Sequence, residues 1–582
     1  MKTKTITFIF ALTASINILS ARAKGDDLLR MYQVDPLQKI FKESTYLIDD
    51  VDTIRVARGG YASIQIVIKG LEDLTDIEVH VKNIQNEGKS TLKEASAGWV
   101  GYVRLGRTYS NPSSERLYST SGYFPDPILT DSLFSLASGE IQPLWITVPI
   151  DSDAEPGLYQ GSVEVNGKHK KKNFRSEKTF FIRVYPITLG KSPFFFSNWS
   201  AHFSPVTLSY LNGGKKVDFY SQDYWDLIEL HAKVMVEHRQ NVFRVFPVWH
   251  TLYTFNDGKY TFDFSRFDHE VEIYESLGAL TLIEGGHLAW RSGNWQSDFY
   301  VETPIPDDDG SRSLPAGVCP QKVENGLRFV KLPLSDERAK NFLRQFLPAL
   351  KEHLRQKGWL DKYVQHIGDE PIESNAESYV DICHFVHEHM DSVRLIDAVM
   401  TSKELEGSVD ISVPILSTLH RDWDFYQEKK KEGEEIWFYV CTNPRGNYAN
   451  RFIELPLLQV RYLHWINFKY DLPGFLHWGL NFWDGPDALN SSASRDRGKL
   501  PAGDHCVVYP GYRKLYTSIR FETERDGIDD YQLLRMLQDK DPAAARSIVD
   551  SIILGFNSYD GSISFFREAH KKLLEKLSNL YQ

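Results

Sequence analysis

Strand-like and helix-like runs alternate along the chain from residue 187 to about residue 520, and no other feature of the sequence constrains the fold as strongly. Such alternation is typical of a parallel sheet whose strands are connected by helices. Eight runs have the length and apolar content of buried strands, and eight strands close a (β/α)8 barrel. The predicted strands are 194–199, 241–247, 280–286, 363–368, 393–399, 411–415, 436–442 and 474–483.

Residues 24–186 show a different pattern, in which apolar side chains recur at every second position. Ile64, Ile66 and Ile68 give the clearest example, and the runs 77–81, 144–149, 159–165 and 179–185 are similar. Turn signals such as Pro156-Gly157 separate these runs. Short strands divided by turns predict an N-terminal β-sandwich.

The clearest helix is predicted over 336–357, where seven apolar residues form one stripe at spacings of three and four. Ser335 can cap its start and Gly358 its end. Helical patterns at 531–537, 543–554 and 565–580 predict a small C-terminal helical region over 521–582. The stretch 291–331 lacks periodicity and is long for a loop, which indicates a functional loop or a lid.

The predicted fold class is therefore α/β. We expect a TIM-like (β/α)8 barrel over 187–520, preceded by the β-sandwich over 24–186 and followed by the helical region.

Two adjacent acids, Asp369 and Glu370, follow the predicted strand 363–368 and precede Pro371. In a parallel barrel the carboxyl ends of the strands form the active site. Two neighbouring carboxylates in a partly dry pocket do not both stay ionised, so one can act as a general acid while the other stays charged. Asp-Glu pairs are also common on solvated surfaces, and only the place at a strand end favours catalysis here.

Other strand ends carry aromatic and polar side chains of the kind that bind sugars. Of the 13 tryptophans, 11 lie between Trp199 and Trp483. Some of these rings can equally be core residues. We predict that the following residues line a substrate pocket typical of a glycosidase: Asn198, Trp199, Glu284, His287, His366, Tyr439, Trp478, Asn481 and Trp483.

Rival chemistries lack their sequence signatures. His384, His387 and His389 are of the type that binds metals, but the order His-Glu-x-x-His is absent and their predicted helix lies outside the barrel. No nucleophile elbow, phosphate-binding loop or dinucleotide fingerprint is present. The four cysteines are too scattered for a disulfide framework or a zinc site. We therefore expect neither a metal nor an organic cofactor.

The run His366-Ile367-Gly368-Asp369-Glu370-Pro371 resembles the catalytic motif of glycoside hydrolase family 123, the β-N-acetylgalactosaminidases. It is also similar to the His-x-Gly-Gly-Asp-Glu run of the family 20 hexosaminidases, with one glycine missing. Further runs resemble the N-terminal β-domain of family 123 and the end of its catalytic region, so the resemblance covers nearly the whole chain after residue 23. These runs are 123–127, 145–161, 501–504, 508–510, 518–520 and 525–531.

The resemblance implies roles for two residues. Glu370 would be the general acid and base, and Asp369 would orient and polarise the 2-acetamido group of the substrate. The carbonyl oxygen of that group would attack the anomeric carbon and give an oxazolinium intermediate, which is the substrate-assisted route to retention. Adjacent acids suit this route, because one serves the leaving oxygen and the other serves the acetamide beside it.

The charge and the first residues bear on partners and location. The net charge of −11 argues against nucleic acid as the main partner. Lys2 and Lys4 precede an apolar run over 6–19 and a small-residue site at 21–23, so residues 1–23 are predicted to be a signal peptide. We expect an exported protein, periplasmic or secreted. No later run of about 20 apolar residues predicts a membrane span.

Together these features predict a retaining exo-glycosidase that acts on terminal β-linked N-acetylgalactosamine. One alternative is a β-hexosaminidase with another preference, such as β-N-acetylglucosamine, or an endo-acting enzyme. A glycan-binding protein without activity is the second alternative, and the intact Asp369-Glu370 pair counts against it.

Overall fold

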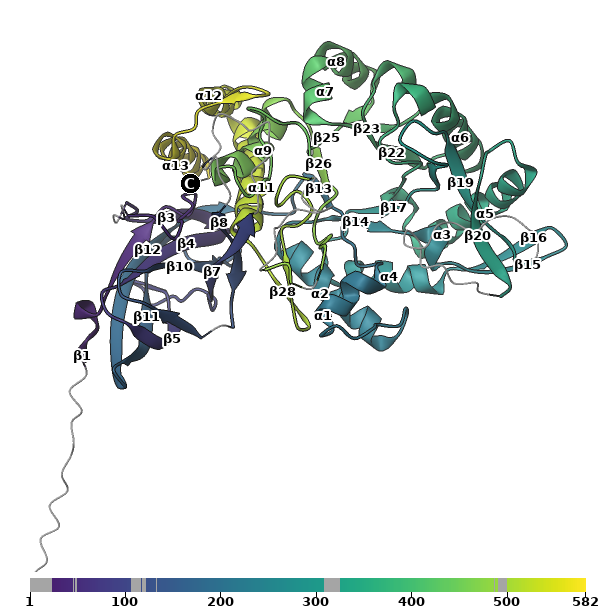
Figure 1. Ribbon diagram of the computed structural model, residues 1–582. Helices are drawn as coiled ribbons and strands as arrows, with labels where there is room; N and C mark the ends of the chain where they lie inside the picture. The colour runs from purple at the N-terminus through teal and green to yellow at the C-terminus, as the bar shows by residue number, and fades with distance from the viewer. Residues whose placement is uncertain are drawn as a thin grey trace, which may run out of the picture.

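The computed structural model describes residues 23–581 except 46, 48–49, 106–116, 118–121, 132, 308–324, 486 and 490–499. A β-rich N-terminal domain and a larger α/β unit lie side by side, and helices of the C-terminal part sit where the two meet (Figure 1). The predicted signal peptide falls almost entirely outside the described residues. Within the described chain, no helix combines the length and apolar character needed to cross a membrane.

The N-terminal domain consists of two sheets that share one apolar core. Ile64, Ile66 and Ile68 are fully buried and pack with Val163 and Phe180 of the opposite sheet. The predicted β-rich domain is therefore confirmed. One sheet has the order β2 (Leu29–Val34), β4 (Tyr61–Gly70), β10 (Ile141–Pro149), β7 (Ser96–Leu105) and β8 (Gly122–Leu129). The other contains β1 (Ala23–Lys24), β12 (Lys172–Thr188), β11 (Gly157–His169), β5 (Leu74–Val81) and β9 (Phe134–Leu136), with β3 (Ile54–Arg58) and β6 (Gln85–Asn86).

Each of the eight predicted strand runs of the α/β unit contains a parallel strand. A six-stranded sheet has the order β14 (Val242–Val245), β17 (Leu282–Gly285), β21 (Tyr363–Gln365), β22 (Arg394–Val399), β23 (Ile411–Pro414) and β24 (Glu435–Ile436). A three-stranded sheet has the order β13 (Phe195–Asn198), β26 (Gly474–His477) and β25 (Phe438–Tyr439). The predicted run 436–442 thus supplies two strands, one to each sheet, on either side of Trp437.

Helices connect the strands of these two sheets, and the longest connecting helix follows the predicted pattern. All seven stripe residues of α5 (Glu337–Lys357) are buried, and Gly358 ends the helix in the left-handed region with φ of 73°. The cap at the start differs from the prediction: the carboxylate of Asp336, not the hydroxyl of Ser335, accepts the N–H of Arg338. The others between strands are α1 (Pro205–Leu211), α2 (Gln222–Glu237), α3 (Pro247–His250), α4 (Ser265–Ser276), α6 (Ala376–His389), α7 (Leu416–Arg421), α8 (Trp423–Glu432) and α9 (Leu457–Lys469).

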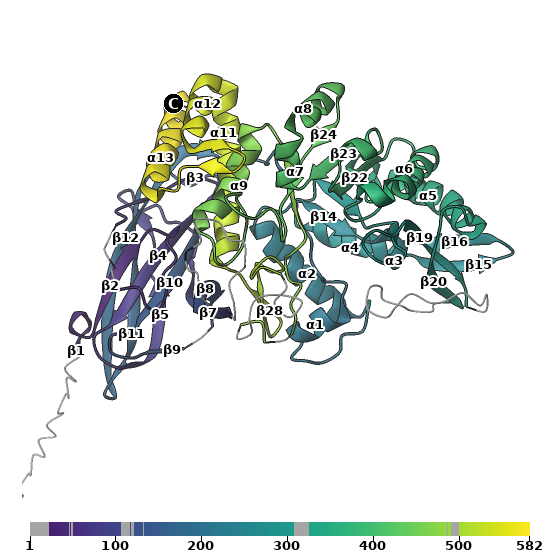
Figure 2. The same ribbon diagram turned by 45° about the horizontal axis from the view of Figure 1, so that its top comes forward.

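The stretch 291–331 was predicted to be irregular, but its described part is an antiparallel sheet. It contains β18 (Ala289–Arg291), β19 (Phe299–Pro306) and β20 (Leu327–Leu332), at one end of the α/β unit (Figure 2). Most of β19 is buried, so its sequence shows no alternation of apolar and polar residues. Residues 308–324 of the predicted loop or lid lie outside the described residues.

The C-terminal helices are α11 (Ile519–Lys540), α12 (Pro542–Ile552) and α13 (Ile563–Leu580). Helix α11 starts close to the beginning of the helical region predicted over 521–582 and before the first predicted helical run at 531. Its first half buries charged side chains as well as apolar ones, so it shows no simple apolar stripe. It packs along α9 and reaches the N-terminal domain (Figure 1). The predicted boundary at residue 520 therefore falls at the start of one continuous helix.

Paired charges hold α11 in place. The guanidinium of Arg520 donates to both carboxylate oxygens of Asp126 in β8, at 2.8 and 2.7 Å, and to three main-chain oxygens. Arg451 donates to both oxygens of Glu524, at 3.2 and 2.9 Å. All four side chains are completely buried. The N-terminal domain thus supplies a carboxylate that neutralises a buried arginine of the α/β unit.

Candidate active site

Asp369 and Glu370 lie in the turn just beyond the carboxyl end of β21, as the sequence predicted. Gly368 precedes them, and a Cβ atom there would lie 2.6 Å from the ring of Phe299. Only glycine fits this approach of the turn to β19. The local sequence therefore brings the two acids to the end of the sheet where α/β enzymes place their catalytic groups.

The turn is held by main-chain contacts. One carboxylate oxygen of Asp397 in β22 accepts the N–H groups of Ile367 and Gly368, at 2.9 and 3.2 Å. The N–H of Glu370 donates to the oxygen of Ala398 at 3.1 Å. Glu370 itself has φ of 49°, in the left-handed region that residues with a Cβ seldom adopt. These contacts fix a backbone conformation that costs on the order of 1 kcal/mol.

Below the turn, His366 joins two buried carboxylates. Its Nδ1 lies 2.5 Å from Asp397 and its Nε2 lies 2.5 Å from Glu284. Burial alone would lower the pKa of His366, but the two carboxylates raise it to about 9. Glu284 also accepts the N–H of Trp199 at 2.9 Å and the hydroxyl of Ser197 at 2.5 Å. His366 is therefore an imidazolium between two anions.

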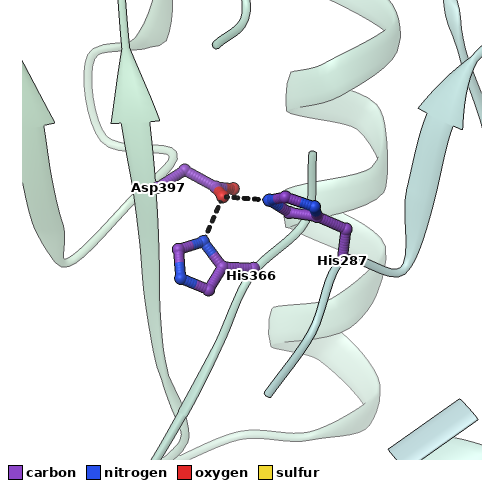
Figure 3. Close-up of side chains that lie close together, drawn as sticks. All are labelled: His287, His366 and Asp397. Atoms are coloured by element: carbon purple, nitrogen blue, oxygen red, sulfur yellow. Dashed lines mark hydrogen bonds and ion pairs between the residues drawn. The ribbon is translucent and has the colours of Figure 1, made fainter. Parts of the chain in front are cut away.

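His287, His366 and Asp397 lie close enough together to resemble a metal site (Figure 3). The side chains do not fit that function, because both nitrogens of His366 bind carboxylates and leave no lone pair for a metal. His287 lies 3.9 Å from Asp397, and burial holds its pKa well below the usual range. Hydrogen bonds account for the positions of His366 and Asp397, while neither ring nitrogen of His287 has a hydrogen-bond partner among the described residues.

The two catalytic candidates have different surroundings. Burial raises the pKa of Glu370 to about 7, and the charge of Asp369 adds to that rise. The hydroxyl of Tyr439 donates to Glu370 and opposes it. Burial also raises the pKa of Asp369, and the charges of Arg291 and Arg244 only partly oppose this rise. At neutral pH Glu370 can therefore hold a proton, while positive charges face Asp369.

Arg244 is a functional candidate that the sequence analysis missed. Its guanidinium lies 3.9 Å from the ring centre of Trp199, and its Cα pairs with that of Glu284 across β14 and β17. The side chain is buried, yet no described residue gives it a hydrogen bond or an ion pair. Burial lowers its pKa to about 10, so it stays charged. A signal existed in the sequence: arginine is out of place in the apolar run 241–247.

Tyr439 and Trp478 lie at the same end of the sheets. The partly exposed Trp478 donates its N–H to Asp504 at 3.2 Å. Burial raises the pKa of Asp504 to about 7, and its charge acts on Glu370. Around Asp369 and Glu370 the structure thus brings together six of the predicted pocket residues: Trp199, Glu284, His287, His366, Tyr439 and Trp478.

The other three predicted pocket residues have different surroundings. Asn481 accepts the N–H of Ala201 at 2.7 Å, and its NH₂ group lies 2.8 Å from His231 of α2. The N–H of Trp483 donates to the main-chain oxygen of Val508 at 2.8 Å, and the ring is buried. Asn198 lies on the opposite face of β13 from its neighbour Ser197, which contacts Glu284.

Two sequence profiles match the chain: the glycoside hydrolase 123 catalytic domain over residues 208–537 and the glycoside hydrolase 123 N-terminal domain over residues 48–167. The chain belongs to glycoside hydrolase family 123. The predicted resemblance is confirmed, and the protein is a glycoside hydrolase.

The chain is similar to solved structures to different degrees. A family 123 glycoside hydrolase from Clostridium perfringens, studied for glycolipid glycan hydrolysis, matches with a TM-score of 0.69 and 16% identity, over 95% of this chain and 97% of that chain. This similarity shows a shared fold. A β-glucuronidase from Parabacteroides merdae matches with a TM-score of only 0.30 and 11% identity, over 81% of this chain and 50% of that one. A search of curated proteins found no match.

Proposed function

We propose that the protein is a retaining exo-glycosidase that removes terminal β-linked N-acetylgalactosamine by substrate-assisted catalysis. The observation that carries the proposal is the adjacent pair Asp369 and Glu370 in a held turn at the carboxyl end of β21, with different charge surroundings. A group with a pKa of about 7 suits a residue that donates a proton in one step and accepts one in the next.

In the first step, Glu370 gives its proton to the glycosidic oxygen and the bond from that oxygen to the anomeric carbon breaks. The carbonyl oxygen of the 2-acetamido group bonds to the same carbon and forms the oxazolinium intermediate. Asp369 stabilises the positive charge that develops on the acetamide nitrogen. In the second step, water attacks the anomeric carbon, the bond from that carbon to the acetamide oxygen breaks and the 2-acetamido group is restored. The water passes a proton to Glu370, and the configuration is retained.

The arrangement of the strands supports a barrel beneath this site. We infer that the two parallel sheets form one (β/α)8 barrel. The N–H of Asn241, just before β14, donates to Phe196 of β13 at 3.3 Å, and β24 leads directly into β25. One apolar cluster contains Val242, Leu282 and Ile411 of the first sheet and Leu476 of the second, as a shared interior requires.

The partners and location follow from the same proposal. The substrate is a carbohydrate with terminal β-linked N-acetylgalactosamine, and the Clostridium perfringens relative, studied on glycolipid glycans, supports a glycan of this class. The steps above need no metal and no organic cofactor. Export after removal of residues 1–23, to the periplasm or the exterior, remains the proposal for location.

Hydrolysis of p-nitrophenyl β-N-acetylgalactosaminide and β-N-acetylglucosaminide by the mature protein tests the function. We expect cleavage of the galactosaminide, with loss in Glu370→Gln and Asp369→Asn. Glu373→Gln is the matched control, since Glu373 is an exposed acid three residues further along the same segment. Faster cleavage of the glucosaminide would favour the hexosaminidase alternative. Glycan binding without cleavage of either compound would favour the non-catalytic one.

A further inference from the structure

Trp295 lies at the tip of the hairpin formed by β18 and β19, next to the catalytic turn. All thirteen tryptophans lie in the described residues, and Trp295 is the only exposed one, with 43% of its surface accessible. A single exposed apolar side chain is ordinary, but a large exposed ring beside an active site is a binding feature when it is rigid.

The ring is held from one side. The guanidinium carbon of Arg291 lies 3.8 Å from the centre of the ring. The Nε of Arg291 donates to the main-chain oxygen of Trp295 at 3.0 Å, and the NH₂ group of Asn375 donates to the same oxygen at 3.2 Å. Because one face of the indole is covered and its backbone is fixed, a ligand that stacks on the ring orders little of the protein.

The same arginine connects the ring to the acid. The Nη2 of Arg291 donates to the main-chain oxygen of Glu370 at 2.6 Å. Its charge also acts on the carboxylates of Asp369 and Glu370. Asn375, the second contact of Trp295, lies on the segment that follows the catalytic turn. One side chain therefore separates the indole from the backbone of Glu370.

We propose that Trp295 and Arg291 form the binding site for the leaving group, in which the pyranose ring next to the scissile bond stacks on the indole. This inference rests on the proposed function, in which Glu370 protonates the glycosidic oxygen. The group beyond that oxygen must then lie on the Glu370 side of the pocket. Arg244 acts electrostatically on Asp369 and Glu284 instead. Because Asp369 serves the acetamide in the proposed reaction, we assign Arg244 to the side of the terminal sugar.

Substrates that share a terminal sugar but differ in the leaving group test the site. They are methyl β-N-acetylgalactosaminide and the disaccharides in which β-N-acetylgalactosamine is linked to O3 or to O4 of galactose. For at least one disaccharide, we expect Trp295→Ala to lower kcat/KM about tenfold, mainly through KM, as for loss of a buried aromatic contact. The methyl glycoside should change less than twofold, and Trp295→Phe should retain most of the activity. Tyr512→Ala, which removes an exposed ring at the turn after β27 (Tyr509–Gly511), is the matched control and should have no effect.

Equal losses on the methyl glycoside and the disaccharides would mean that Trp295 only supports Arg291 and Glu370, and would overturn the inference. Unchanged kinetics on both disaccharides would also overturn it. Calorimetric binding of the disaccharides to Glu370→Gln, with and without Trp295→Ala, gives a readout without turnover. Binding that is about tenfold weaker with Trp295→Ala would support the leaving-group site even if the proposed chemistry failed, and equal binding would reject the site.

Discussion

Buried charges occur in two parts of this enzyme, and their partners differ. Along α11, Arg520 has five donated hydrogen bonds to acceptors that include both oxygens of Asp126, and Arg451 is paired with Glu524. In the pocket, Arg244 is buried with no bonded acceptor among the described residues. Bonded carboxylates neutralise Arg520 and Arg451, although the Nε of Arg451 has no hydrogen-bond partner among the described residues. Arg244 has no bonded carboxylate, and only the more distant charges of Glu284 and Asp369 act on it.

An unpaired buried charge is costly, so a folded chain retains one only where a ligand or water completes it. This difference separates two motifs that look alike in the sequence. Both 366–371 and 525–531 are rich in acids, and both resemble family 123. Asp529 and Asp530 of the second motif bind Arg239 and Arg461 and so hold α11 in place. The acids of the first motif face the pocket.

The largest expected effect is on chemistry. Glu370→Gln keeps the shape and the contact with Tyr439 but removes the proton that the leaving oxygen needs. We expect kcat to fall by about 10² to 10⁴-fold for an unactivated leaving group. The far-ultraviolet spectrum should be unchanged. Activity within tenfold of the unmodified enzyme would contradict the assignment of Glu370 as the acid.

The next largest expected effect is a loss of stability when a buried charge pair of α11 is broken. Asp126→Ala leaves the guanidinium of Arg520 buried without its carboxylate, and we expect the free energy of unfolding to fall by about 3–5 kcal/mol. Urea denaturation measures this loss. The folded fraction should keep its kcat, because Asp126 lies in β8 of the N-terminal domain. A loss of kcat without a loss of stability would remove the distinction between the two sets of charges.

Arg244→Met tests the buried arginine that has no bonded carboxylate. We expect the guanidinium of Arg244 to donate hydrogen bonds to the bound sugar, so its removal should lower kcat/KM about 10- to 100-fold. The stability of the variant should stay the same or rise, since an unpaired buried charge is removed. Thermal unfolding and kinetics on the same sample check both parts. A destabilisation as large as that of Asp126→Ala would show that Arg244 has a structural partner.

The smallest effect is a shift in pH dependence. In the proposed mechanism Glu370 acts as the acid in its protonated form, so kcat/KM should fall as the pH rises through about 7. The hydrogen bond from Tyr439 favours the ionised form and lowers the pKa of Glu370. Tyr439→Phe should therefore move the alkaline limb to higher pH. A limb that stays in place or moves down would show that another group controls it.

The sequence predicted the parts of the fold that depend on local apolar patterns. All eight strand runs contain strands, because each has a buried, apolar segment of sufficient length. The hairpin of β18 and β19 was missed, and the helical region predicted over 521–582 had no definite helical run before residue 531, since buried polar pairs and two-sided burial leave no periodic signal. The barrel, the domain boundaries and the roles of the site residues remain predictions.

The site was predicted only in part for a related reason. Asp369 and Glu370 follow one strand and Tyr439 ends another, and their proximity at one sheet edge could be inferred from order alone. Arg244 and Arg291 come together with Asp369 through tertiary structure, and neither stands in a recognisable motif. Asn481 shows the opposite error: a polar residue after a strand end can use both polar atoms of its side chain in hydrogen bonds within the protein.

The left-handed backbone at Glu370 bears on how such an enzyme would lose its activity. Glycine adopts φ of 49° without the penalty that a side chain brings, so Glu370→Gly would relieve the turn while destroying the acid. Selection for a stable fold alone would therefore favour replacement of Glu370 by glycine. A chain that had become a passive sugar-binding protein would have had an easy route to glycine here. A glutamate on a backbone better suited to glycine fits the role that we propose for its side chain.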